Sequence, residues 1–136
     1  MGRLFVYYGD CDSLHSLKKS LSLSMEYISY SEYDFGNVSD YERYCIGGYN
    51  KIVLYTFAKF VSKAEHDAKS FKVTAAFVDS FISCLDWSVD AVKCISALLE
   101  YVNVYLFTTK EEDIEALGKL PTSIFRVEER FKSKKA

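Results

Sequence analysis

The sequence predicts a three-layer α/β/α sandwich of the Rossmann-like type, with a mainly parallel sheet of five or six strands. Apolar runs of strand length alternate with helical patterns along the whole chain. The chain has 136 residues, of which 49% are hydrophobic and only one is proline, so it can bury one core with short connections. Strands separated by helices form βαβ units, whose right-handed crossovers give a parallel sheet covered on both faces.

Six apolar runs have the length of a strand. In chain order they cover residues 4–8, 25–30, 52–55, 73–78, 102–107 and 124–127. The first run ends at Gly9 and Asp10, and the fourth closes on Asp79. Continuous apolar runs are typical of strands that are buried on both faces. The last run is short, so we expect it at an edge of the sheet.

Five segments between these runs have amphipathic helical patterns. They cover about residues 12–21, 39–45, 62–71, 88–102 and 109–117. In the first of them Leu14, Leu17 and Leu21 recur at i, i+3 and i+7, with Asp12 or Ser13 as the expected cap. The second, third and fifth each open on a capping box, in which Ser or Thr is followed three residues later by Glu. The fourth is the longest and is expected to pack on the sheet.

Composition excludes several classes of protein. The net charge of −2 and the pI near 5.7 argue against a protein that coats nucleic acid, which needs a strongly basic face. The four cysteines are widely spaced, without the pairing of a structural zinc site. No apolar stretch reaches membrane-spanning length, and no signal peptide precedes the first strand, so we expect a cytoplasmic protein without membrane contact. We assign residues 1–127 to one α/β domain and residues 128–136 to a basic, solvated tail.

Common catalytic motifs are absent from the sequence. Neither a Walker loop nor a G-x-G-x-x-G after the first strand occurs, which disfavours conventional nucleotide binding. Cys11 lies near His15, but no hydrolase motif surrounds them, so we interpret Cys11 as a loop thiol.

Ligands of open α/β sheets bind at the carboxyl ends of the strands, so the residues that follow each strand are the first candidates for a site. Asp10 and Asp12 follow the first predicted strand, Thr56 the third, Asp79 the fourth and Lys110 the fifth. Three carboxylates at one rim would suit a divalent cation. The alternative is structural, with Asp12 as a helix cap and the other two aspartates at strand ends.

The segment Tyr-Tyr-Gly-Asp-Cys-Asp-Ser-Leu-His-Ser-Leu at residues 7–17 resembles the first motif of the DHH phosphoesterase superfamily, to which the RecJ nucleases belong. That motif has two aspartates one residue apart after the first strand, followed by a helix. Residues 50–56 lie where the family's second motif ends a strand in a metal-binding aspartate, and residues 72–81 lie where it has Asp-His-His. The resemblance covers about residues 3–107 and implies the α/β sandwich.

The chain departs from this family at most of its metal ligands. Thr56 stands in place of the second-motif aspartate, and Ser80 and Phe81 stand in place of both histidines. Neutral side chains do not supply the ligand field of a two-metal site. The resemblance therefore implies a catalytically inactive member without a cofactor, in which Asp10, Asp12 and Asp79 are remnants.

An inactive, shortened RecJ-like domain is similar to the RecJ-related component of the archaeal and eukaryotic replicative helicase, which works with GINS and the MCM ring. The resemblance thus implies a scaffold in DNA replication that binds proteins of the GINS and MCM type and has some affinity for single-stranded DNA. Candidate rim contacts for such a partner, with burial in the core as the alternative for the aromatic ones, are Tyr49, Thr56, Phe57, Phe60, Ser80, Phe81 and Lys110.

Three other hypotheses stay open. The first is a phosphoesterase or PIN-like nuclease that uses Asp10, Asp12 and Asp79, with Glu111 or Glu112, to hold magnesium or manganese. The second is a pseudo-receiver signalling domain, which would have Thr56 where receivers have the phosphoacceptor aspartate. The third is a viral or plasmid α/β binding protein of unrelated descent. The sequence does not define the oligomeric state.

Overall fold

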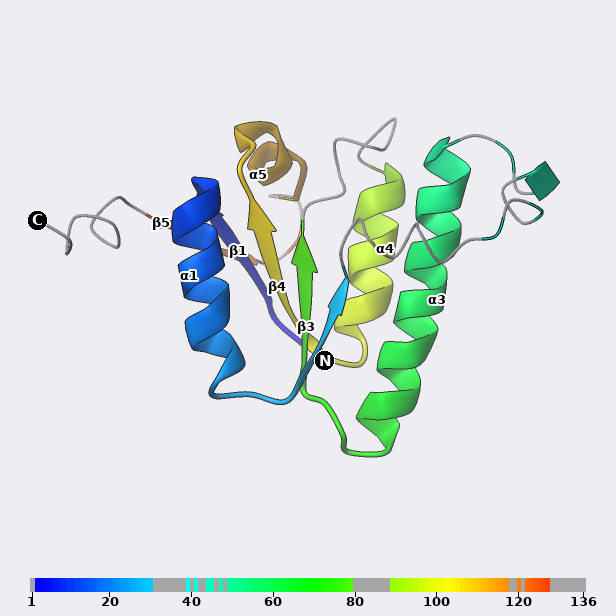
Figure 1. Ribbon diagram of the computed structural model, residues 1–136, viewed down its shortest axis with the longest axis horizontal. Coiled ribbons are helices and arrows are strands. Elements are labelled where there is room, and N and C mark those ends of the chain that lie inside the picture. The colour runs from blue at the N-terminus through cyan, green and yellow to red at the C-terminus, as the bar shows by residue number, and fades with distance from the viewer. Residues whose placement is uncertain are drawn as a thin grey trace, which may run out of the picture.

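A parallel sheet with helices on both faces forms the fold. The computed structural model of the chain describes residues 2–30, 39, 41, 44–45, 47, 49–79, 89–117, 120 and 122–127. Within these residues the five strands are β1 (Leu4–Gly9), β2 (Tyr27–Tyr30), β3 (Ala75–Asp79), β4 (Asn103–Thr108) and β5 (Thr122–Val127). The helices are α1 (Cys11–Ser22), α3 (Tyr49–Lys69), α4 (Val89–Leu99) and α5 (Glu111–Leu117) (Figure 1). The predicted Rossmann-like α/β class is confirmed.

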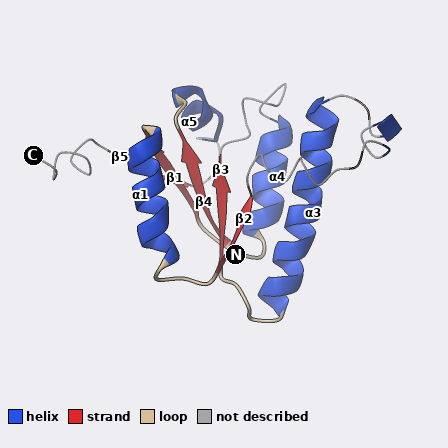
Figure 2. Cartoon of the chain, in the orientation of Figure 1, coloured by secondary structure: helices blue, strands red, loops and turns tan. Residues whose placement is uncertain are grey.

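All neighbouring strands run parallel, in the order β2-β3-β4-β1-β5. The chain runs from β1 through α1 to β2 at one edge of the sheet and then returns through β3 to β4. From β4 it crosses β1 through α5 and reaches β5 at the other edge. Figure 2 shows α1 on one side of the strands and α3 and α4 on the other. The sheet is therefore doubly wound, and β5 lies at the edge where a short final strand was predicted.

One face of the sheet is mainly aliphatic and packs against α3, α4 and α5. Alternate residues of the three central strands point to this face and are buried there: Leu4, Val6, Ala76, Val78, Val104 and Leu106. Phe57 of α3, Ile95 of α4 and Leu117 of α5 complete the same core, and each is fully buried. This is the larger of the two cores, because three helices cover it.

The opposite face is aromatic, and α1 packs on it. Its rings come from all five strands and contact one another by stacked or edge-on packing: Phe5, Tyr7, Tyr27, Phe77, Tyr105, Phe107 and Phe125. Leu14 and Leu17 of α1 pack against these rings. Burial, together with the nearby phenol of Tyr105, raises the pKa of Tyr7 above its ordinary value.

The predicted strand at residues 52–55 is wrong, because this segment lies inside α3. The predicted helix start at Ser62 also falls in the middle of α3. Leu54, Phe57 and Val61 recur at i, i+3 and i+7 and face the core, so the helical period continues through the apolar run. The sheet consequently has five of the six predicted strands.

Parts of the prediction lie outside the described residues. These are most of the predicted helix 39–45, the first residue of the predicted helix 88–102 and the tail 128–136, although Tyr41, Tyr44 and Cys45 are helical. Among the helices that the structure describes, none has the length and apolar character needed to cross a bilayer.

Candidate functional site

The switch point of the doubly wound sheet lies between β1 and β4. The connections that leave these two adjacent strands run in opposite directions on opposite faces, α1 on one and α5 on the other. In open α/β sheets a crevice forms outside the carboxyl ends of the strands at this point.

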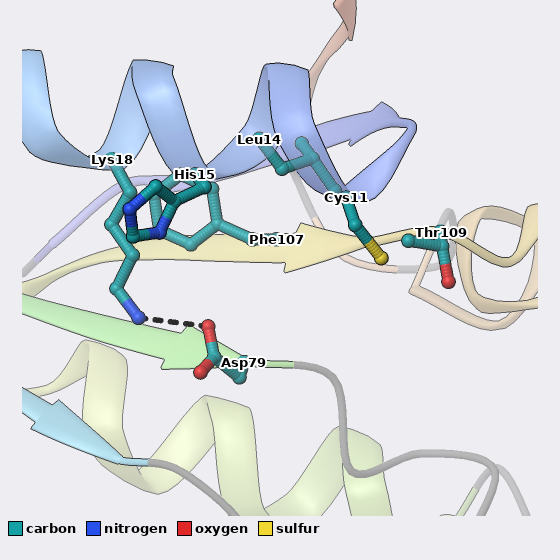
Figure 3. A pocket seen from close by; sticks show the side chains of 7 residues that line it. All are labelled: Cys11, Leu14, His15, Lys18, Asp79, Phe107 and Thr109. Atoms are coloured by element: carbon teal, nitrogen blue, oxygen red, sulfur yellow. Dashed lines mark hydrogen bonds and ion pairs between the residues drawn. The ribbon is translucent and has the colours of Figure 1, made fainter.

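A cavity of about 300 Å³ lies next to this switch point (Figure 3). It is bounded by the first turns of α1 and by the carboxyl ends of β3 and β4. The lining side chains are Cys11, Leu14, His15, Lys18, Asp79, Phe107 and Thr109. The floor is apolar, with Leu14 and Phe107, and the rim carries a thiol, an imidazole, an ammonium, a carboxylate and a hydroxyl. This mixture is typical of a small-ligand cleft.

An ion pair crosses the cavity. Lys18 Nζ donates a hydrogen bond to Asp79 Oδ1 at 2.9 Å, and the same ammonium lies 5.8 Å from the centre of the Phe107 ring. The side chains of Lys18 and Asp79 are 27% and 43% exposed, so solvent screens the pair in part. Figure 3 shows that the pair joins α1 to the end of β3, with His15 beside Lys18 and the Cys11 sulfur directed toward Thr109. A positive charge thus already occupies the side of Asp79 that faces the cavity.

Asp10 performs a structural task at the start of α1. The helix begins at Cys11, so Asp10 is its cap, where the sequence predicted Asp12 or Ser13. Asp10 Oδ1 accepts a hydrogen bond from the Ser13 backbone N–H and Oδ2 accepts one from the Ser13 hydroxyl, both at 2.9 Å. Both carboxylate oxygens therefore satisfy groups of the first helical turn.

Removal of this cap should destabilise the fold. We expect Asp10→Ala to lower the free energy of unfolding by about 0.5–2 kcal/mol, and Asp10→Asn to cost much less because asparagine caps helices as well as aspartate does. Urea denaturation followed by circular dichroism measures both changes. Equal losses for alanine and asparagine would contradict a capping role and indicate that the negative charge itself matters.

The structure does not bring the three predicted aspartates together as a metal site. Asp79 lines the cavity, Asp10 is directed into the α1 start, and Asp12 is exposed in the first turn of that helix. In the described part of the chain, no three His, Cys, Asp or Glu side chains are grouped so that they could hold a metal ion.

The candidate rim contacts have different positions from those expected. Thr56, Phe57 and Phe60 lie within α3 and are buried, so the core interpretation holds for both phenylalanines. The Thr56 hydroxyl is hydrogen-bonded to the Tyr30 hydroxyl at 2.9 Å, inside the protein. Lys110 is exposed at the carboxyl end of β4, as expected. Ser80, Phe81 and the side chain of Tyr49 lie outside the described residues.

The structure differs from what the DHH resemblance and the pseudo-receiver hypothesis lead one to expect. The second-motif position of the DHH resemblance is helical, so Thr56 does not end a strand. The third strand in chain order is instead β3, which ends in Asp79. Receiver sheets have the order 2-1-3-4-5, with the first strand beside the third. In this chain β4 separates β1 from β3, which does not match the receiver arrangement.

Sequence reasoning missed Lys18 and Phe107 as site residues. A signal for Lys18 was present, because Cys11, His15 and Lys18 recur at i, i+4 and i+7 and therefore share one face of α1. Phe107 gave no such signal, since a phenylalanine within an apolar strand looks like any core residue.

Fold and site together define a doubly wound α/β protein with a small polar-rimmed cleft at its switch point. Neither a scan against protein-family models nor a search of the curated proteins finds a match for the chain.

Proposed function

We propose that this chain is a non-catalytic binding domain, namely the RecJ-like scaffold that its first motif implies, and that its partners are replication proteins of the GINS and MCM type. The observation that supports this proposal most is the engagement of the remnant carboxylates. Asp10 uses both oxygens to hold the start of α1, and Asp79 pairs with Lys18. A metal ion at Asp79 Oδ1 would compete with the Lys18 ammonium group.

The described lining of the cavity also differs from the ligand set of a two-metal hydrolase. Two-metal hydrolysis needs two ions about 3.5–4 Å apart, each held by several oxygen or nitrogen ligands. The described residues around the cavity supply one carboxylate and one imidazole, Asp79 and His15, and the carboxylate is already paired with Lys18. Binding of a partner at the carboxyl edge requires no such clamp, and Lys110 is exposed there to meet an acidic surface.

Three measurements on the purified protein test the proposal. Calorimetric titration with Mn²⁺ should give no heat at micromolar metal, and a labelled single-stranded oligonucleotide should remain intact. Purified GINS and MCM subunits should bind in the same buffer. Lys110→Glu should weaken that binding several-fold, whereas Lys63→Glu, an exposed lysine within α3, should leave it unchanged.

The opposite result has a clear meaning. Micromolar Mn²⁺ binding together with cleavage that disappears in Asp10→Asn would overturn the scaffold and favour the phosphoesterase hypothesis. Failure of every GINS and MCM subunit to bind would overturn the replication partners.

A further inference from the structure

The ion pair across the carboxyl-end cleft can open at little cost to the fold. Lys18 Nζ and Asp79 Oδ1 lie 2.9 Å apart, but both side chains are partly exposed, and pairs of this kind contribute little to stability. Lys18 reaches Asp79 through a flexible four-carbon chain, so its ammonium group can turn toward another acceptor. A ligand that offers a new partner to each of the two charges can therefore replace the pair.

Other hydrogen-bonding groups at the cleft have no task in the described part of the fold. Asp79 Oδ2, the His15 ring and the Thr109 hydroxyl form no hydrogen bond with any residue that the structure describes. His15 and Thr109 are exposed, and Asp79 is partly so. These groups, together with the remaining N–H groups of Lys18, supply donors and acceptors to a molecule in the cleft.

The floor between these polar groups is apolar. Leu14 of α1 and Phe107 of β4 line the cleft and are only 7% and 5% exposed. The cleft has a volume of about 300 Å³, whereas about 150 Å³ is enough to hold benzene. The space therefore accommodates a small molecule whose charged head lies at the ion pair and whose apolar part lies on the floor.

The two charges discriminate between possible head groups. A head with only a negative charge would pair with Lys18 but would be repelled by the Asp79 carboxylate. A head with only a positive charge would pair with Asp79 but would be repelled by the Lys18 ammonium group. A head that carries a carboxylate and an ammonium group on one carbon pairs with both side chains, so it replaces one ion pair by two.

We propose that the cleft binds a free α-amino acid with an apolar side chain. The ligand carboxylate accepts hydrogen bonds from Lys18, the ligand ammonium group donates to Asp79, and the apolar side chain lies on Leu14 and Phe107 (Figure 3). His15, which Figure 3 shows beside Lys18, supplies a further donor for the ligand carboxylate. This binding goes beyond the proposed scaffold function and does not depend on the identity of the protein partners.

An NMR titration of the purified chain with three probes tests the charge requirement. The probes are L-phenylalanine, 3-phenylpropionate, which lacks the ammonium group, and phenethylamine, which lacks the carboxylate. L-Phenylalanine should shift the amide signals of α1 and of the end of β3. It should bind at least about tenfold more tightly than either analogue, because each analogue loses the hydrogen bonds of one charged group. Equal affinity for an analogue, or no shift with L-phenylalanine at about 10 mM, would overturn the proposal.

Variants of the charged pair test the position of the ligand. Lys18→Met and Asp79→Asn should each weaken the binding of L-phenylalanine by about tenfold or more. Lys19→Met removes an exposed lysine of the same helix that does not line the cleft, and should leave the binding unchanged. Thermal unfolding followed by circular dichroism shows that each variant is folded. Wild-type affinity in folded Lys18→Met or Asp79→Asn, or an equal loss in Lys19→Met, would contradict a site at the ion pair.

Discussion

Replacement of Phe57 by alanine is expected to lower the free energy of unfolding by about 3–5 kcal/mol. Phe57 is fully buried in the middle of α3, and its ring meets Tyr30 of β2 edge-on at 4.9 Å and Phe60 at 5.8 Å. Truncation removes this apolar contact and leaves a cavity that the sheet and the helix cannot close. Domains of this size are stable by about 5–15 kcal/mol, so the loss is a large share of the total.

Urea denaturation measures this loss, with the denaturant dependence unchanged if the native state stays compact. Ser62→Ala, on the exposed side of the same helix, is the control and should change the free energy by less than about 0.5 kcal/mol. A small effect at Phe57 would contradict its place in the core and revive the hypothesis that it is a partner contact at the rim.

The predicted fold class was correct because it depends on the alternation of strands and helices along the whole chain, and one wrongly assigned segment does not change that alternation. The error at residues 52–55 has a physical cause: four apolar residues, two of them β-branched, satisfy a buried strand and a buried helix equally well. The length of the uninterrupted segment around these residues decides between a strand and a helix. No glycine or proline interrupts residues 49–69, so one helix of 21 residues can continue through the run.

The candidate site was predicted only in part. The rule that ligands bind at the carboxyl ends of strands correctly indicated the neighbourhood of Asp79. It did not indicate which side chains meet there, because that depends on the strand order. With β4 between β1 and β3, the residues at the end of β1 lie away from Asp79, and α1 brings Lys18 to it instead.

The two ends of the sheet thus carry different kinds of side chains. At the carboxyl end, Asp79 is paired with Lys18 and Asp10 caps α1 beside a small cleft. At the amino end, the exposed Phe71 borders an open recess that is lined by both polar and apolar residues.

Phe77→Ala is the second change with a large expected effect, about 3–5 kcal/mol in the free energy of unfolding. Phe77 lies in β3 and is fully buried under α1 on the aromatic face. Its ring stacks on Tyr27 at 4.3 Å and meets Tyr105 and Phe107 edge-on at 5.6 and 5.7 Å. Alanine would remove all three ring contacts, which join β2 to β4 across the centre of the sheet.

Phe125→Ala provides the matched comparison, because it deletes the same side chain from the same ring cluster. Phe125 lies on the edge strand β5, is 43% exposed, and stacks only on Phe5 and Tyr7 among the described rings. Since about half of the ring is already in water, we expect a loss of about 1–2 kcal/mol. Urea denaturation of both variants measures the difference. Equal losses would contradict the exposed position of Phe125 on the edge strand β5.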